Sequence, residues 1–589
     1  MHDPQLMVLI ALISLIIFMA GVFMYKFVYP KKNIHPLILL LGISLLPLIS
    51  ILRPGSYESG DLSAHAKIAI MFYNMISHGN MIPQWSDLVC GGYGCPYFIF
   101  MYISPYYIAS LFHSFGFSFV DSIKLVLATS FVGSGMAMYF WAKEEFGKKA
   151  GFIAGLFYLF APYHLVDLHF RNAVGEMLAI TALPLCFLFT KKIIMDAKPL
   201  WIILNAISIS FLIFSHLVAS VITIPFLVIY SLLILLHKKK NKFRSFASVL
   251  LSFFLSLSLS SFYWIPIAFE KQYIFWGSVT FVFFSPLSDL LYSPWRLGFL
   301  FQGHSGEASH AVGYFQLLAV VVALWFLVKK KITNRYKKNI LILFLLSFLV
   351  TFLMILPMAK PLWDIIPLMK SFQFSYRLLI FNIFSTSIIA GIVLEEIPHK
   401  KFVIIFCFLA FATTILNWGN RKVAPEITDQ SIKNQLLYTD FAQRDFVSPI
   451  WINGNPTYNK HRPLGDQLIV TSGQAQIKQI KSDPLKHEYL ILAQSDISLR
   501  DNTFYYPGWI VTANENPTPI ILKDKQYPGT IMFTLKKGLY KVDVQFTDTL
   551  ARKIGKYITL LTVIAILLYT FIALLPKKFY KKIMSLQYK

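Results

Sequence analysis

The chain has 589 residues, of which 56% are hydrophobic, 16% aromatic and only 14% charged. Its apolar residues occur in blocks long enough to cross roughly 30 Å of hydrocarbon, which indicates a polytopic membrane protein rather than a soluble one. The formal net charge of +25 could suggest a nucleic-acid-binding protein. Membrane proteins, however, gather Lys and Arg in cytoplasmic loops, so we expect membrane lipids as partners and no nucleic acid.

The apolar blocks, taken in chain order, predict about thirteen membrane-spanning helices, several of them short. They lie at residues 6–25, 37–52, 121–142, 150–164, 176–194, 200–216, 218–236, 246–268, 314–329, 339–357, 377–394, 402–418 and 557–575. The predicted fold is a polytopic α-helical membrane protein whose main domain covers residues 1–418.

The loops between these helices differ in charge. Loops assigned alternately to one side carry 27 basic and 5 acidic residues, whereas the loops of the opposite side carry 9 and 11, leaving out residues 419–556. Since basic loops stay in the cytoplasm, this asymmetry predicts a plasma-membrane protein with its N-terminus and large loops outside and its C-terminus inside.

The first outer loop, residues 53–120, is expected to contain juxtamembrane helices. Apolar residues at helical spacing in 62–78 would let a helix lie on the bilayer surface. Residues 97–115 are apolar enough to cross, but a crossing there would put later Lys-rich loops on the wrong face, so we interpret them as juxtamembrane or re-entrant. Cys90 and Cys95 are compatible with a disulfide and equally with unpaired thiols.

From residue 419 the composition becomes polar, with stretches of period-two alternation separated by turn residues. This pattern predicts an extracytoplasmic antiparallel β-sandwich over residues 419–556. The aromatic run from Tyr505 to Trp509 is interpreted as core packing around a Pro-Gly turn, so we place no active-site residue there. Residues 557–589 are expected to form the last membrane helix and a basic cytoplasmic tail.

Asp61 is a carboxylate in a polar loop directly after an apolar block. One interpretation is that it caps the helix that follows. The other is a general base or a metal-assisting carboxylate at the lipid interface, where partial desolvation raises basicity. Glu58 and His65 flank it and could assist or be solvated.

A second polar cluster falls between two short spans on the same predicted face. Asp167 and His169 could hold a divalent cation or orient an acceptor, and Arg171 could bind a phosphate with its fork of donors. Glu176 closes the cluster. The alternative is a solvated interfacial loop in which Arg171 reaches lipid headgroups.

Arg377 opens a predicted span with no adjacent acid in the sequence, so an anionic partner is expected. That partner could be the phosphate of a polyprenyl-phosphate sugar. The alternatives are a lipid headgroup or pairing with Asp364 or Glu176. His216 ends another span and is expected to be packed or capping rather than catalytic.

Several motifs together resemble a known superfamily. Gly60-Asp61, the following helix with His65, and Gly79-Asn-Met-Ile-Pro-Gln-Trp85 resemble the first outer loop of the GT-C glycosyltransferases. The segments Pro162-Tyr-His-Leu-Val-Asp-Leu-His-Phe-Arg-Asn-Ala-Val-Gly-Glu176, Phe372-Gln-Phe-Ser-Tyr-Arg377 and Phe504-Tyr-Tyr-Pro-Gly-Trp509 resemble the bacterial YfhO-like family, which overlaps one called 6-pyruvoyl-tetrahydropterin synthase-related membrane protein. The family more often has Pro and Trp where this chain has Ser375 and Tyr376. A pterin synthase would need a histidine zinc triad, and the sequence shows no such cluster.

The resemblance implies a GT-C-like membrane glycosyltransferase of the cell envelope that moves a hexosyl or pentosyl group from a polyprenyl-phosphate donor to a glycan or glycopolymer acceptor. It implies Asp61 as the catalytic base. It implies substrate or phosphate binding by Arg171, Arg377, His65, His169 and Glu176, and an Mg or Mn ion at Asp61 and Asp167. Many spans with interfacial charges also fit a lipid or polysaccharide transporter or flippase, and a non-catalytic envelope assembly protein is a third hypothesis.

Overall fold

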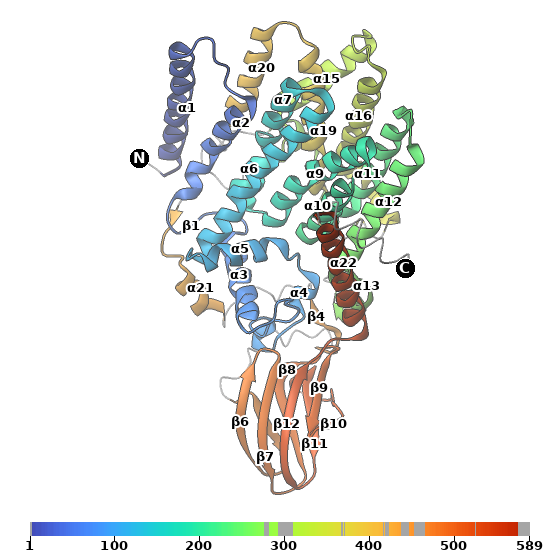
Figure 1. Cartoon of the computed structure of the whole chain (residues 1–589). Coiled ribbons are helices and arrows are strands. Elements are labelled where there is room, and N and C mark those ends of the chain that lie inside the picture. Colours follow the sequence, from blue (N-terminus) through green and yellow to red (C-terminus); the bar gives the residue numbers. More distant parts are fainter. Residues whose placement is uncertain are drawn as a thin grey trace.

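The computed structural model describes residues 3–275, 282–292, 310–366, 369, 372–415, 418, 423–436, 447–452, 466–524 and 526–574. The helices form one body, and a strand domain projects from its lower end in Figure 1. Short helices of residues 53–120, the predicted first outer loop, lie between the two parts. The predicted basic tail after residue 574 lies outside the described residues.

Eight helices in the described part of the chain are long and apolar enough to cross a membrane. They are α1 (Asp3–Val28), α6 (Phe119–Phe146), α9 (Val174–Asp196), α11 (Leu217–His237), α12 (Lys242–Leu259), α16 (Arg335–Ile355), α19 (Leu379–Glu396) and α22 (Leu550–Leu574). A further candidate is the pair formed by α7 (Lys148–Leu159) and the segment Pro162–Arg171, bent by 49°. These helices confirm the predicted polytopic membrane class.

The remaining predicted spans fall on shorter helices. Apolar helices of 10–17 residues occupy Pro36–Leu52, Pro199–Ser215 and Tyr314–Val328, which contain α2 (Pro36–Leu45), α10 and α15. The predicted span 402–418 coincides with α20 (Lys400–Ala412), and the predicted span 246–268 is divided between α12 and α13 (Ser261–Glu270).

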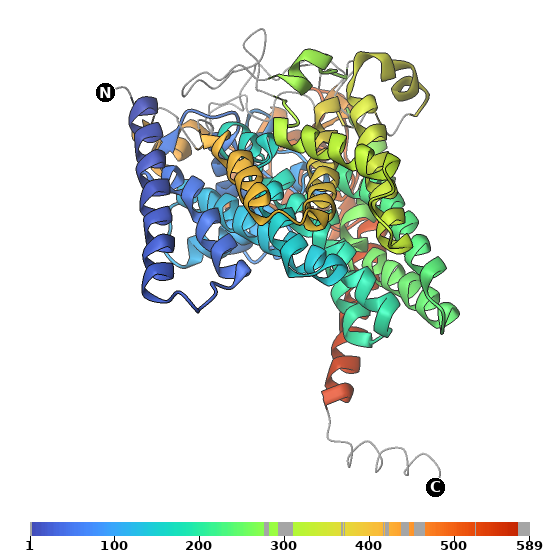
Figure 2. The same cartoon turned by 90° about the horizontal axis from the view of Figure 1, so that it is seen from above.

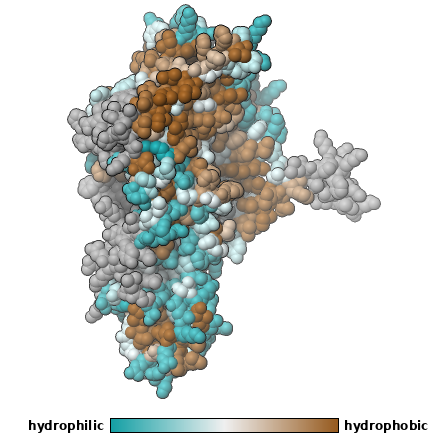
Figure 3. Space-filling model, turned by 90° about the vertical axis from the view of Figure 1, so that its left-hand side faces the viewer, coloured by the Kyte–Doolittle hydropathy of each residue, from teal (hydrophilic) through white to brown (hydrophobic). Residues whose placement is uncertain are grey.

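Helix α19 is the core of the body, because it is buried along almost its whole length. It packs against α7, α15 and α16. In contrast, few residues of α1 and α22 are buried, and α1, dark blue in Figure 2, stands at one edge of the body. The surface over the helices is largely hydrophobic in Figure 3, and the strand domain is mostly hydrophilic with hydrophobic groups near its tip, as expected where only the helices meet lipid.

The first outer loop folds against the protein. Its helices are α3 (Leu62–Ser77), α4 (Tyr97–Phe100) and α5 (Ser104–Ser114). The 11 residues of α5 extend about 17 Å, too short to cross a bilayer, which agrees with a juxtamembrane position. The expectation that α3 lies with its apolar stripe on the bilayer is wrong, because Leu62, Ala66 and Ala69 are fully buried and α3 packs on α5 and α6.

The strand domain is an antiparallel β-sandwich, as predicted. One sheet has the order β10-β9-β12-β7-β6 and the other β11-β8-β5. Tyr489 and His487 of β7 both reach Asp501 of β8, so the two sheets face each other. The strands are β5 (Leu468–Ser472), β6 (Ala475–Asp483), β7 (Lys486–Ala493), β8 (Ile497–Phe504), β9 (Trp509–Ala513), β10 (Asn516–Thr518), β11 (Thr530–Leu535) and β12 (Gly538–Phe546).

The sandwich therefore begins near residue 468 rather than at 419. Before it, β3 (Val423–Ala424) pairs with β1 (Ser56–Tyr57) of the first outer loop. Asp429 at the start of α21 (Asp429–Leu436) accepts hydrogen bonds from the first amides of α6, Phe119 N and Val120 N. Polar composition alone does not separate this docked segment from the strands that follow. The other short elements are α14 (Leu287–Leu291), α17 (Lys360–Ile365), β2 (Ile274–Phe275) and β4 (Ser448–Pro449).

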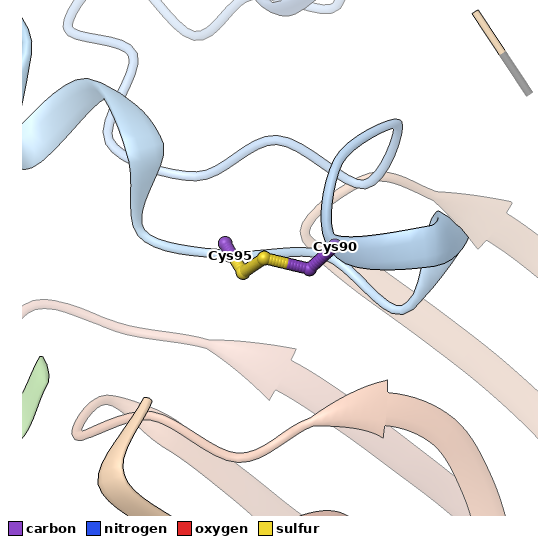
Figure 4. The surroundings of a disulfide bond; sticks show 2 residues. All are labelled: Cys90 and Cys95. Atoms are coloured by element: carbon purple, nitrogen blue, oxygen red, sulfur yellow. A yellow bond between two sulfur atoms is a disulfide. The ribbon is translucent and has the colours of Figure 1, made fainter. Parts of the chain in front are cut away.

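Two contacts fix the sandwich to the membrane domain. Cys90 and Cys95 form a disulfide (Figure 4). In the hairpin that it closes, Tyr93 stacks on Phe504 at 4.6 Å between ring centroids. Just before it, Trp85 packs edge-on against Trp509. The run 505–509 was expected to pack within the sandwich core; Trp509 does pack there against His487 and Phe546, and the run also lies at this joint.

The second contact is an ion pair between buried side chains. Arg552, at the start of α22, donates from Nη2 to Glu270 Oε2 (2.8 Å) at the end of α13. Tyr506 Oη also donates to Glu270 Oε2 (3.1 Å). A buried carboxylate needs such partners, so the end of α13, the start of α22 and the 505–509 run form one joint.

Candidate functional site

The loop carrying Asp61 is hydrogen-bonded to the second predicted cluster. Gly60 N donates to Phe170 O (2.7 Å), and Asp61 N donates to Arg171 O (3.0 Å). A Cβ on Gly60 would lie 3.2 Å from Arg171 O, so glycine permits this close approach. Two segments about one hundred residues apart in sequence thus meet at one place.

The carboxylate of Asp61 is not used as a helix cap. Asp61 occupies the cap position of α3 by its backbone, since His65 N donates to Asp61 O (2.8 Å), but its side chain makes no capping bond. Ser59 Oγ instead accepts from Leu62 N (3.2 Å). Asp61 is exposed, so its carboxylate is accessible to a second molecule.

Arg171 lies at the end of a π-helical turn. Residues Asp167–Arg171 form this turn, and Asn172 ends it in the left-handed conformation (φ 55°). Asn172 Nδ2 donates to Leu168 O (2.7 Å) and to Tyr57 Oη (3.1 Å). Such turns are rare and occur often at functional sites. Here the turn exposes the carbonyls that bind the Asp61 loop.

The guanidinium of Arg171 is held by two buried carboxylates. Its Nη2 donates to Glu176 Oε1 (2.8 Å), and its Nη1 donates to Asp167 Oδ1 (2.5 Å) and to Tyr163 Oη (2.7 Å). Tyr163 Oη in turn donates to Glu176 Oε2 (2.6 Å). The aromatic face of Tyr376 lies 5.1 Å from the guanidinium carbon. The alternative of a solvated loop is therefore wrong for these side chains.

Arg377 joins the same cluster. Its Nε lies 3.3 Å from Glu176 Oε1, so of the two acids considered for it the structure selects Glu176, while Asp364 pairs with Lys360. Arg377 Nη1 donates to Phe372 O (2.9 Å). Its Nε makes no hydrogen bond within the described part of the chain, and 19% of the side chain is exposed. Arg377 retains more donor capacity than Arg171.

Aromatic and histidine rings line the side of the cluster next to Asp61. His65 Nδ1 is 2.9 Å from Tyr106 Oη, and the rings of Tyr102 and Tyr106 are parallel at 6.0 Å. Tyr102 also stacks on His216 at 6.2 Å. Burial lowers the pKa of His65, although the charge of Asp61 acts in the opposite direction. His65 is thus favoured in its neutral form beside an anion.

His216 has the capping role expected from the sequence, since its Nδ1 accepts from Ala219 N (3.1 Å) at the start of α11. Sequence reasoning missed the tyrosines and Asn172. Tyr163 lies in the motif from Pro162 to Glu176, whereas the sequence around Tyr102 and Tyr106 gives no indication of a role beyond their aromatic character. His169 and Asp167 are buried within the turn.

The donors for a metal ion do not gather here. Among the described residues, no group of three or more His, Cys, Asp or Glu side chains could hold one ion. Asp167 Oδ1 is already engaged by Arg171. An Mg or Mn ion at Asp61 and Asp167 stays a prediction, and these residues alone do not fit the ligand number that either ion prefers.

Comparison with known proteins gives one family match. The sequence model of a family described as 6-pyruvoyl-tetrahydropterin synthase related domain, membrane protein, matches residues 100–421. No curated protein matches the chain.

Three solved structures illustrate the structural likeness. The apo oligosaccharyltransferase of Archaeoglobus fulgidus is 12% identical, with 73% of this chain and 59% of that chain covered, at a TM-score of 0.38. The arabinofuranosyltransferase AftD from Mycobacteria is 13% identical, with 68% of this chain and 27% of that chain covered, at a TM-score of 0.42. ArnT from Cupriavidus metallidurans is 14% identical, with 68% of each chain covered, at a TM-score of 0.31. The chain thus spans less than two thirds of the first two proteins, and with scores this low none of the three carries the functional argument.

Proposed function

The chain belongs to the 6-pyruvoyl-tetrahydropterin synthase related family of membrane proteins, and from that premise we propose that it is a GT-C-like glycosyltransferase. It would move a sugar from a polyprenyl-phosphate donor to a glycan or glycopolymer acceptor at the outer face of the plasma membrane. The observation that carries the proposal is that the loop of the exposed Asp61 is hydrogen-bonded to the backbone of Arg171, whose side chain shares Glu176 with Arg377.

Asp61 is the general base in this proposal. Its carboxylate accepts the proton of the acceptor hydroxyl while that oxygen attacks the anomeric carbon of the donor. The bond between the anomeric carbon and the phosphate oxygen breaks, and the lipid phosphate leaves with the electron pair. Asp61 suits this step because it is exposed and its side chain does not cap α3.

Arg377 is assigned to the departing phosphate. Its unused donor capacity faces a site that already holds Glu176, and an anionic ligand would complete its pairing. Arg171 is already paired with Glu176 and Asp167. In this proposal its positive charge stabilises the departing phosphate at a distance, without donating hydrogen bonds to it directly. Glu176 orients both arginines. His65 is assigned to the side of the site where the substrate binds, and His169 belongs to the buried turn 167–171. No step is routed through a metal ion.

Two observations support an outer position of the site. The charge asymmetry of the loops assigns the first outer loop to the outside. The same loop contains the Cys90–Cys95 disulfide, and disulfides persist in oxidising compartments outside the cytoplasm. Lipid-linked donors suit that location, where nucleotide sugars are not expected.

The test is transfer from radiolabelled polyprenyl-phosphate sugars by the purified chain in nanodiscs. Asp61→Asn keeps the shape of the side chain but cannot accept the proton, so the rate should fall by about 100-fold or more. Glu58→Gln is the matched control, because Glu58 is an exposed acid of the same loop.

Full activity of Asp61→Asn would remove Asp61 as the base. Measured lipid translocation without transfer would favour the transporter or flippase. Loss of envelope assembly on deleting the sandwich, with Asp61 dispensable, would favour the non-catalytic assembly protein.

A further inference from the structure

Tyr102 is a half-buried residue that the proposed mechanism does not use. It lies in the short link between α4 and α5, next to Ile103, whose N–H donates to Phe214 O (3.0 Å). Phe214 belongs to the last turn of α10, so this bond ties the link to the helical body. The position of Tyr102 is therefore set by the packing of the helices.

Tyr102 lies next to both halves of the candidate site. Its ring centroid is 6.3 Å from that of His65, which follows Asp61 by about one turn of α3. A Cβ on Gly175 would lie 3.0 Å from Tyr102 Cζ, the ring carbon that bears the hydroxyl. Gly175 directly precedes Glu176, the carboxylate shared by the two arginines. The hydroxyl end of Tyr102 thus lies at the start of α9.

The charges of both halves act on the Tyr102 hydroxyl. Burial raises the pKa of Tyr102, the negative charge of Asp61 raises it further, and the positive charge of Arg377 lowers it. The pKa stays above its ordinary value, so the hydroxyl is protonated at neutral pH and can donate a hydrogen bond as well as accept one. Because charges act most strongly over short distances, this result agrees with the contacts of the ring.

Neighbouring rings hold Tyr102 in place. The ring of Tyr106 is parallel to it at 6.0 Å, and that of His216 stacks on it at 6.2 Å. Tyr106 is fully buried, and its Oη lies 2.9 Å from His65 Nδ1, so its hydroxyl has a partner within the protein. Tyr102 is the tyrosine of this pair that stays partly exposed. A side chain already held in one position loses little entropy when it binds a ligand.

The reaction assigned to this site requires the sugar to lie between Asp61 and Arg377. The anomeric carbon forms a bond to the acceptor oxygen beside Asp61 while it loses its bond to the phosphate oxygen beside Arg377. We propose that Tyr102 donates a hydrogen bond to a hydroxyl of this sugar and so selects which sugar is transferred. A site built to bond a hydroxyl rejects a sugar that lacks it, because the polar group of the protein is then left without a partner. The inference rests on the proposed function and adds a residue that determines its sugar specificity.

The first experiment measures binding, which does not depend on transfer. The full chain in nanodiscs is titrated with a panel of polyprenyl-phosphate hexoses and pentoses and with sugar-free polyprenyl phosphate. The unchanged protein should bind at least one sugar-bearing lipid more tightly than the sugar-free lipid. Tyr102→Phe keeps the ring and its packing, and it should lower the affinity for that lipid about tenfold, the loss expected for one hydrogen bond. Its affinity for the sugar-free lipid should stay within about twofold.

Two variants serve as controls. Tyr107→Phe removes a hydroxyl from the same helix, α5, but Tyr107 Oη donates to Met81 O (2.5 Å). The preference for the sugar-bearing lipid should therefore stay within about twofold of the unchanged protein. Arg377→Gln should weaken the binding of both lipids, because both carry the phosphate.

The second experiment identifies the hydroxyl by kcat/KM for transfer from the preferred donor and its monodeoxy analogues. With one of these analogues the unchanged protein should lose about tenfold, and Tyr102→Phe should lose no more than it has already lost with the complete sugar. Such non-additive losses show that the two missing hydroxyls were bonded to each other. A purely structural role of Tyr102 would give additive losses with every analogue.

Equal weakening of the sugar-bearing and sugar-free lipids by Tyr102→Phe would overturn the proposal, as would additive losses throughout the donor series. A panel in which no sugar-bearing lipid binds better than the sugar-free lipid would overturn it as well. A sugar preference that Tyr102→Phe abolishes, in a protein that transfers no sugar, would refute only the proposed function. Transfer with additive losses would refute only the role of Tyr102.

Discussion

Tyr158 compensates for a proline inside the helix that carries Glu176. Pro184 lies within α9 and has no N–H to donate to Ile180 O, four residues earlier. Tyr158 Oη of α7 donates to that carbonyl (2.7 Å). Both partners are fully buried. Tyr158→Phe should therefore leave a buried carbonyl without its partner and reduce the free energy of unfolding by about 1–3 kcal/mol.

A double-mutant cycle tests this explanation. Pro184→Ala restores an N–H opposite Ile180 O. In that background, the loss of unfolding free energy caused by Tyr158→Phe should be smaller by at least about 1 kcal/mol. The measurement is reversible unfolding of the purified chain in mixed micelles. Tyr139→Phe is the control, because the Tyr139 hydroxyl is buried without a hydrogen-bond partner in the described residues, so its loss should be neutral or stabilising.

An additive cycle would refute the reasoning, since the two changes would then act on different groups. A loss for Tyr139→Phe as large as that for Tyr158→Phe would also refute it. In that case, removal of any buried hydroxyl would account for the effect.

Three further predictions concern the Asp61 loop, the sandwich and the disulfide. Gly60→Ala should lower the rate of sugar transfer about tenfold, because the added Cβ moves the Asp61 loop away from Arg171 O. Gly21→Ala is the control and should leave the rate unchanged, because Gly21 has open space around it. The measurement is the initial rate of transfer at equal protein concentration. Burial raises the pKa of Asp501, but His487 and the hydrogen bonds around it outweigh burial and lower it overall. The stability that Asp501 contributes is therefore present above its unfolded pKa of about 3.9 and is lost as the pH falls through the lower folded value. Melting temperatures measured from neutral to acid pH should depend less on pH in Asp501→Asn than in the unchanged protein. Cys90→Ser with Cys95→Ser should cost about 2 kcal/mol by the loop-entropy relation and increase hydrogen exchange at residues 504–509, and unchanged exchange would contradict a role in docking.

Hydropathy and alternation predicted the spans and the sandwich because each depends on neighbours in sequence. The assembly of the site depends on contacts that no local period encodes. Glu176 follows Arg171 by five residues, which is not a helical neighbour spacing, and the two meet because the turn ends at Asn172 in the left-handed conformation. The pairing of Arg377 with Glu176 was one of several alternatives, and the three-dimensional structure selects it.

The same limit explains the error at α3. An amphipathic stripe shows that one face is buried but not whether lipid or protein covers it. At Leu62 and Ala66 the cover is protein.

The two joints of the sandwich come from distant parts of the chain: Trp85 and Tyr93 belong to the first outer loop, and Glu270 meets Arg552 across 282 residues. A domain attached at one point can swing, whereas attachment at two separated points removes that rotation. The sandwich therefore keeps one orientation relative to the helical body. A molecule that contacts both the sandwich and the helices would then meet two surfaces whose spacing is set by the folded protein.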